Sequence, residues 1–162
     1  MKITLDLTGI LAIWGAVLST IAIFWDIYKW RTSGPSLHMR VSTGMVAYNM
    51  PVYEGRTLIM VSVTNRGDRP TTITHLNMAY YDTWWKAILC MKPSQNYWVA
   101  NPNTFQQVPF ELKPGIEWKG MIEQNSEIEI WAQEGYLYST LNHSHNKKPM
   151  RQRIVIRKPK SQ

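Results

Sequence analysis

The stretch LTGILAIWGAVLSTIAIFW, residues 7–25, decides the architecture of this chain of 162 residues. It carries no charge, and Asp6 and Asp26 lie directly before and after it. As an α-helix rising about 1.5 Å per residue, the stretch reaches roughly 28 Å, close to the thickness of the hydrocarbon core of a bilayer. Tyr28 and Trp30 follow where an interfacial aromatic belt would lie. The sequence therefore predicts one membrane-spanning helix within residues 1–31.

A cleaved signal peptide is the alternative interpretation of this stretch. It requires a positively charged start and a small-residue cleavage site, whereas Lys2 is opposed by Asp6 and the apolar run ends in FWDIYKW. We therefore predict an anchor. Because Lys29, Arg31 and Arg40 outnumber Lys2 on the other flank, the positive-inside rule places the C-terminal part in the cytoplasm. The predicted location is a bacterial inner membrane, with the N-terminus periplasmic.

Small and polar residues follow one face of the predicted helix. Spacings of three and four residues keep them within an arc of roughly 80° at about 100° per residue. Small residues let helix backbones approach closely in lipid, so the stripe predicts a homo-oligomer, with a tetramer as the working size. Small residues are also common in membrane helices without any role in assembly, which is the alternative. The predicted packing and pore-lining residues are Ala12, Gly15, Ser19, Ala22 and Asp26, the last of which would favour cations as a ring.

Residues 32–36 form a linker rich in Gly, Pro and Ser, and residues 37–162 are predicted to be all β and cytosolic, with a basic tail. Turn residues such as those of NRGDRP (65–70) separate short alternating runs. Eight or nine such runs favour one antiparallel β-sandwich over a closed barrel. The expected strand-like runs are residues 37–43, 57–65, 71–81, 84–91, 112–118 (which contains a Pro-Gly turn), 119–123, 127–132, 135–143 and 151–157.

One pattern within these strands resembles immunoglobulin-like (Ig-like) sandwich domains of bacterial proteins. It consists of V-x-V-x-N-x-G, carried by Val61, Val63, Asn65 and Gly67, and of L-x-P-G from residue 112. The resemblance covers about half of the β part and implies an Ig-like fold without implying any chemistry.

A search for catalytic motifs finds neither GxxxxGK[ST] nor GxGxxG. Glu127 and Glu129 alternate with isoleucines, the pattern of a solvated strand face. His143 and His145 could share a strand face as metal ligands do, but a third ligand is not evident. Cys90 lies in an apolar run and is expected to be a small buried residue. We therefore predict a protein that is not an enzyme and needs no cofactor or metal.

Basic residues outnumber acidic ones by 18 to 11 and gather with aromatic residues in the β part. Residues 147–160 hold seven basic residues and no acid, and Arg151, Arg153 and Arg157 share one face of the last expected strand. Cations neutralise phosphates while Trp and Tyr stack on bases, a combination used to bind single strands. A solvated tail and contact with anionic lipid are the alternatives. The predicted oligonucleotide-binding residues are Lys147, Lys148, Arg151, Arg153, Arg66, Arg69, Lys86, Trp84 and Trp98.

One N-terminal membrane helix joined to a small cytosolic β-domain with a basic, aromatic surface resembles the membrane effectors of bacterial antiphage systems. The plan is most similar to the Hailong-type effector, an oligomer restrained by a single-stranded DNA oligomer. It is also similar to the effectors of type III CRISPR systems that cyclic oligoadenylates gate. The resemblance covers the architecture of the whole chain and no motif that can be aligned.

This resemblance implies a pore- or channel-forming homo-oligomer of antiviral defence. Its ligand would be a single-stranded oligonucleotide or cyclic nucleotide bound to the β-sandwich, and a nucleotidyltransferase encoded nearby would be a partner. Two other classes stay open. One is a membrane-anchored protein-interaction module or assembly subunit without ligand gating, and the other is a membrane-anchored enzyme.

Overall fold

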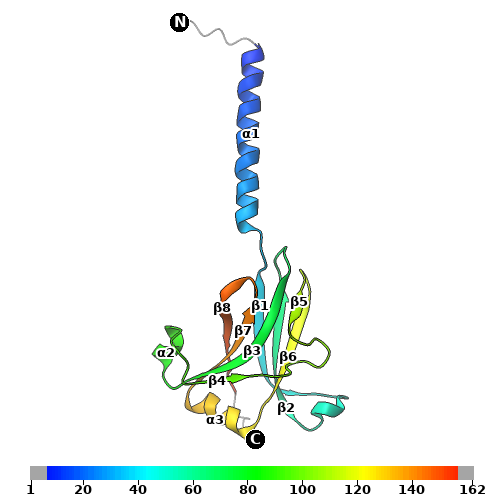
Figure 1. Cartoon of the computed structure of the whole chain (residues 1–162), viewed down its shortest axis with the longest axis vertical. Coiled ribbons are helices and arrows are strands. Elements are labelled where there is room, and N and C mark those ends of the chain that lie inside the picture. The colour runs from blue at the N-terminus through cyan, green and yellow to red at the C-terminus, as the bar shows by residue number, and fades with distance from the viewer. Residues whose placement is uncertain (1–6, 157–162) are drawn as a thin grey trace, which may run out of the picture. The chain divides into compact units, whose positions relative to one another are not determined.

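The computed structural model describes residues 7–156 and contains a long N-terminal helix and two antiparallel β-sheets (Figure 1). The chain divides into two compact units, Met1–Gly34 and Pro35–Gln162. The predicted fold class, a membrane-length helix followed by an all-β sandwich, is confirmed. Lys2, Asp6 and Arg157, on which parts of the sequence analysis depend, lie outside the described residues.

Helix α1 spans Leu7–Thr32 without interruption. Its stretch Leu7–Arg31 is long and apolar enough to cross a membrane, and none of it is buried against other described parts of the protein. Large apolar side chains are exposed along it, Trp14 by 61% and Phe24 by 68%. In water this exposure would be costly, whereas in a bilayer it places the side chains against lipid.

Within residues 7–156, the β-sandwich has eight strands in two sheets. The three-stranded sheet has the order β1-β2-β6 and consists of β1 (Leu37–Val46), β2 (Thr57–Asn65) and β6 (Glu117–Glu123). The five-stranded sheet has the order β4-β3-β7-β8, and β5 also pairs with β3. Its strands are β3 (Thr71–Tyr81), β4 (Gln95–Trp98), β5 (Phe110–Leu112), β7 (Tyr136–His143) and β8 (Asn146–Arg153). A short turn of 3-10 helix, η1 (Pro51–Tyr53), lies between β1 and β2.

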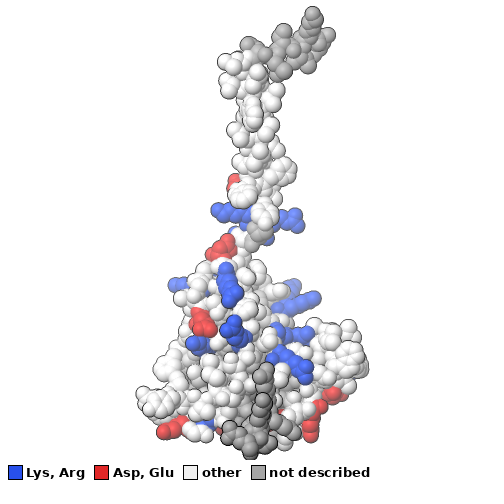
Figure 2. Space-filling view, turned by 180° about the vertical axis from the view of Figure 1, so that it is seen from behind, with Lys and Arg blue, Asp and Glu red and all other residues white. Residues whose placement is uncertain are grey.

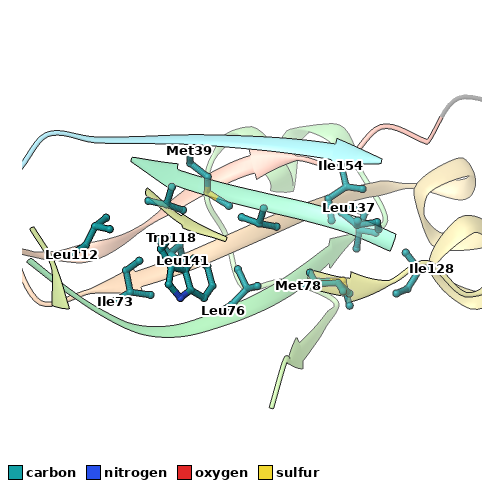
Figure 3. Packing of buried hydrophobic residues seen from close by; sticks show 14 residues of the cluster. Met39, Ile73, Leu76, Met78, Leu112, Trp118, Ile128, Leu137, Leu141 and Ile154 are labelled. Atoms are coloured by element: carbon teal, nitrogen blue, oxygen red, sulfur yellow. The ribbon is translucent and has the colours of Figure 1, made fainter. Parts of the chain in front are cut away.

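Apolar side chains from both sheets meet in one core (Figure 3). Trp118 is fully buried there, and its Nε1 donates a hydrogen bond to the carbonyl of Gln106 at 2.9 Å. Gly120 leaves room for the indole, because a Cβ at that position would come within 2.6 Å of the Trp118 ring. The other buried members are Met39, Ile59, Val61, Val63, Ile73, Leu76, Met78, Leu112, Ile122, Ile128, Leu137, Leu141 and Ile154.

Two of the expected strands are helices. Residues 127–132 belong to α3 (Ser126–Glu134), where the Asn125 side chain accepts a hydrogen bond from the backbone N–H of Ile128 and so caps the first turn. Ile128 and Ala132 pack on the core at a spacing of four, which a helix satisfies and a strand does not. The prediction that Glu127 and Glu129 lie on a strand is therefore wrong.

Residues 84–91 likewise contain α2 (Trp84–Ile88), in which Ala87 is the buried residue. The chain then turns through Cys90, whose φ is +54°, and the Cys90 side chain is exposed. The prediction of a buried cysteine is wrong, because the apolar run that surrounds it is not a strand of the core.

The last strand begins earlier than expected. β8 ends at Arg153, whereas the sequence placed a strand at 151–157. Ser144 and His145 connect β7 to β8, so this part of the chain is a tight hairpin. The shift brings Lys147 and Lys148 into β8 itself.

Candidate functional site

The outer face of the five-stranded sheet, turned away from the core, carries polar and basic side chains. Alternation along β3 directs Leu76 and Met78 into the core and Asn77 to the outer face. Strand register places Asn77 opposite Thr140 of β7, and Thr140 opposite Arg151 of β8. Three strands thus contribute one row of polar groups. Figure 2 shows that Lys and Arg side chains gather on the upper part of the sandwich, while several Asp and Glu side chains lie at its lower edge.

A pocket of about 610 Å³ lies on this face, beside the segment that follows α2; we call it the basic pocket. Its polar lining combines cations with carboxamides, and within the described residues 7–156 its lining includes no Asp or Glu. The cations are Lys92, Lys147, Lys148 and Arg151, and the uncharged polar residues are Asn77, Asn96, Asn142 and Thr140. Ala79, Tyr81, Cys90, Met91, Pro93 and Pro149 complete the lining.

Arg151 is the best-fixed cation of the basic pocket. Its guanidinium lies over the Tyr138 ring, 5.3 Å from the centroid, and Nη1 donates to the Ala87 carbonyl at 3.0 Å. An arginine has five N–H donors, so further donors remain for an anion. Arg153 lies over the Tyr136 ring at 4.7 Å but does not line the pocket.

A second set of contacts fixes the wall of the pocket. The Lys86 ammonium lies 3.1 and 3.0 Å from the two carboxylate oxygens of Asp82, and the Ser94 hydroxyl donates to the same carboxylate at 3.0 Å. The hydrogen bond from Lys86, followed by that from Ser94, lowers the pKa of Asp82 below its ordinary value. Lys86, one of the predicted binding residues, ties α2 to the end of β3 and does not line the basic pocket.

The remaining predicted binding residues lie apart from one another. Arg66 lines a separate pocket on the three-stranded sheet, and Arg69 lies in the β2–β3 turn, where its carbonyl accepts from Asn65. Trp84 on α2 and Trp98 on β4 are exposed by 59% and 65%, and neither lines the basic pocket. The structure therefore brings Lys147, Lys148 and Arg151 together and does not bring Arg66 or Arg69 to them.

Several residues of the basic pocket are not among the predicted binding residues, above all the asparagines and Lys92. Asn77 and Thr140 each occupy an outward position of an alternating strand, which the sequence does show. These two residues lie side by side only because β3 pairs with β7. The Thr140 hydroxyl donates to the Asn77 carbonyl at 3.3 Å, although 63 positions of sequence separate the two residues. Pairing over such a separation leaves no local signal.

The histidine pair forms no metal centre in the described part of the chain, where no group of three or more His, Cys, Asp or Glu could hold an ion. Burial lowers the pKa of His143, and the neighbouring His145 lowers it further. His143 thus favours its neutral form at the end of β7.

The predicted stripe on α1 is exposed along its length at Ala12, Gly15, Ser19, Ala22 and Asp26. The Ser19 hydroxyl donates to the Gly15 carbonyl at 2.8 Å, so its polar group is satisfied within the helix. A Cβ at Gly15 would meet no described atom within 4 Å. This face of α1 can therefore accept the close approach of another helix.

Comparison with known proteins gives no family. A scan against protein-family models finds no match for the chain, and a search of curated proteins finds no similar sequence. The chemistry of the basic pocket and the length of α1 are therefore the observations that bear on function.

Proposed function

We propose that the β-sandwich binds a short single-stranded oligonucleotide or a cyclic nucleotide in the basic pocket. The observation that carries this proposal is the lining, in which Lys92, Lys147, Lys148 and Arg151 accompany three asparagines and, among the described residues, no carboxylate. Cations bind the phosphates of such a ligand, and carboxamides both donate and accept hydrogen bonds at base edges. A volume of about 610 Å³ admits about two nucleotides and is too small for a duplex.

The membrane part of the proposal is that α1 anchors this sandwich in a bacterial inner membrane with the sandwich in the cytoplasm. Lys29 and Arg31 lie in the last turn of α1 and Arg40 lies in β1, so these positively charged residues are on the C-terminal side of the span. Such charge stays on the cytoplasmic side. A fluorescent protein fused to the C-terminus should be bright, and alkaline phosphatase fused there should be inactive. Active phosphatase would reverse the orientation and remove cytosolic nucleotides from the set of ligands.

The proposed activity is that of an oligomeric pore- or channel-forming effector of antiphage defence that its ligand controls. The small residues that share one face of α1, among them Ala12, Gly15 and Ser19, support assembly through α1. Expressed without any ligand or partner that holds it inactive, the protein should depolarise the inner membrane. Gly15→Leu should abolish depolarisation because the larger side chain holds the helix backbones apart. A potential-sensitive dye in growing cells measures this.

Ile13→Leu is the matched control, since Ile13 lies outside the stripe and the change conserves volume. It should depolarise as the parent does, at equal protein levels in the membrane. Equal depolarisation by the parent, Gly15→Leu and Ile13→Leu would show that this face does not mediate assembly.

A protein-interaction module is the second candidate function, and the surface around α2 favours it. Five large apolar residues within eight positions are each exposed by 43% or more: Trp84, Trp85, Ile88, Leu89 and Met91. Exposed apolar patches of this kind often mark interfaces. Failure of the full chain to bind oligonucleotides at low salt would make this candidate the leading one.

A further inference from the structure

A second polar pocket, of about 320 Å³, lies on the outer face of the three-stranded sheet; we call it the sheet-face site. Its lining differs from that of the basic pocket, because among the described residues it contains no tyrosine, tryptophan or phenylalanine and no carboxamide, and His38 supplies its one ring. The site therefore has little ring surface on which a nucleobase could stack. The lining residues are His38, Arg40, Ser42, Met60, Ser62, Thr64, Arg66, Glu117 and Lys119.

Strand register arranges these side chains in rows across the sheet. Arg40 of β1 lies opposite Ser62 of β2, and Ser62 lies opposite Lys119 of β6. Lys119 also forms an ion pair with Glu117 at 3.3 Å, so this pair contributes little net charge. Arg40 and Arg66 supply the positive charge of the site, with the Ser62 hydroxyl between the outer strands.

The sheet-face site lies at the end of the sandwich where the linker enters. The backbone N–H of Arg66 donates a hydrogen bond to the Ser36 carbonyl at 2.7 Å, and the backbone N–H of Ser36 donates to Oδ1 of Asn65 at 3.3 Å. The linker is thereby fastened to the turn that carries Arg66. Because α1 ends at Thr32 and β1 begins at Leu37, even a fully extended linker keeps β1 within about 18 Å of the end of the helix.

We propose that the sheet-face site binds the phosphate of an anionic phospholipid headgroup in the membrane that α1 spans. Arginine guanidinium groups bind phosphate oxygens through two parallel hydrogen bonds, and the serine and threonine hydroxyls can donate to the remaining oxygens. The chemistry would also suit a free phosphate monoester. The short tether selects the lipid, because it holds Arg40 and Arg66 close to a surface that attracts cations.

Full-length protein in micelles of a neutral detergent tests this proposal. Native mass spectrometry measures its binding of short-chain phosphatidylglycerol and of short-chain phosphatidylcholine. The parent should prefer phosphatidylglycerol, and the double variant Arg40→Gln, Arg66→Gln should bind it about tenfold or more weakly. Ser62→Glu, which places a carboxylate between the cations, should have the same effect. Near-UV circular dichroism identifies variants that remain folded.

The control is Lys147→Gln with Lys148→Gln, which removes two charges from the basic pocket and should leave the preference for phosphatidylglycerol intact. Equal binding of phosphatidylglycerol by the parent and by folded variants of Arg40, Arg66 and Ser62 would overturn the proposal. Displacement of the lipid by equimolar glycerol phosphate would also overturn it, because the ligand would then be a free phosphate. Neither result affects the proposed role of the basic pocket.

Discussion

Replacing Lys147, Lys148 and Arg151 together by glutamine is expected to lower the affinity for a short single-stranded oligonucleotide by at least about 100-fold at low salt. These residues supply three of the four cations of the basic pocket. Hydrogen bonds to charged groups contribute about 1.5–3 kcal/mol each, and about 1.4 kcal/mol corresponds to a tenfold change in affinity. Fluorescence anisotropy of a labelled oligonucleotide with the detergent-solubilised full chain measures the change.

A charge-matched control separates the pocket from the general positive field of the protein. Arg40→Gln, Arg66→Gln and Lys113→Gln also remove three charges, but none of these residues lines the basic pocket. This control should bind the oligonucleotide within a few-fold of the parent. If both triple variants lost affinity equally, binding would depend on net charge and the basic pocket would have no specific role.

The second large effect concerns stability. Trp118→Ala should destabilise the sandwich by about 3–5 kcal/mol, because it empties the centre of the core and leaves the Gln106 carbonyl without its donor. Small domains have about 5–15 kcal/mol of stability in total. With a urea dependence of about 2 kcal/mol per M, the unfolding midpoint should fall by roughly 2 M. Near-UV circular dichroism of the full chain in micelles follows this transition.

Trp98→Ala is the matched control, since the Trp98 side chain is 65% exposed on the outer face. Its unfolding midpoint should stay within about 0.5 M of that of the parent, as is usual for exposed positions. A Trp118→Ala midpoint that moved no further than that of Trp98→Ala would contradict the placement of Trp118 at the centre of the core.

The elements that local pattern determines could be predicted from the sequence. The uncharged run at 7–25 predicts α1, and alternation predicts β2 and β3 at the bounds they have. Alternation misleads at α3, because Glu-Ile-Glu-Ile resembles a strand while the Asn125 cap and the spacing of Ile128 and Ala132 favour a helix. The short α2 was missed for a different reason, since five residues are too few to show a helical period.

The candidate site could be predicted only in part. Lys147, Lys148 and Arg151 lie within five positions of one another in the sequence, so their clustering was visible. Arg66 was assigned to the same site on composition, yet it lies on the other sheet. Asn77 was missed because only the pairing of β3 with β7 and of β7 with β8 places it in one row with Arg151. Residues brought together by strand order have no local signature, and charge alone cannot assign a residue to one sheet or the other.

The salt dependence of oligonucleotide binding by the full chain tests the central claim most directly. Each phosphate contact with a single strand contributes about −0.7 to the slope of the logarithm of the association constant against the logarithm of the salt concentration. With the four cations of the basic pocket, this slope should be near −2.8. Removing one contact by Lys92→Gln should reduce it to about −2.1, because Lys92 is one of the four. Absence of binding at low salt by folded, membrane-extracted protein, or an identical slope in the parent and Lys92→Gln, would contradict the claim that this pocket binds phosphates.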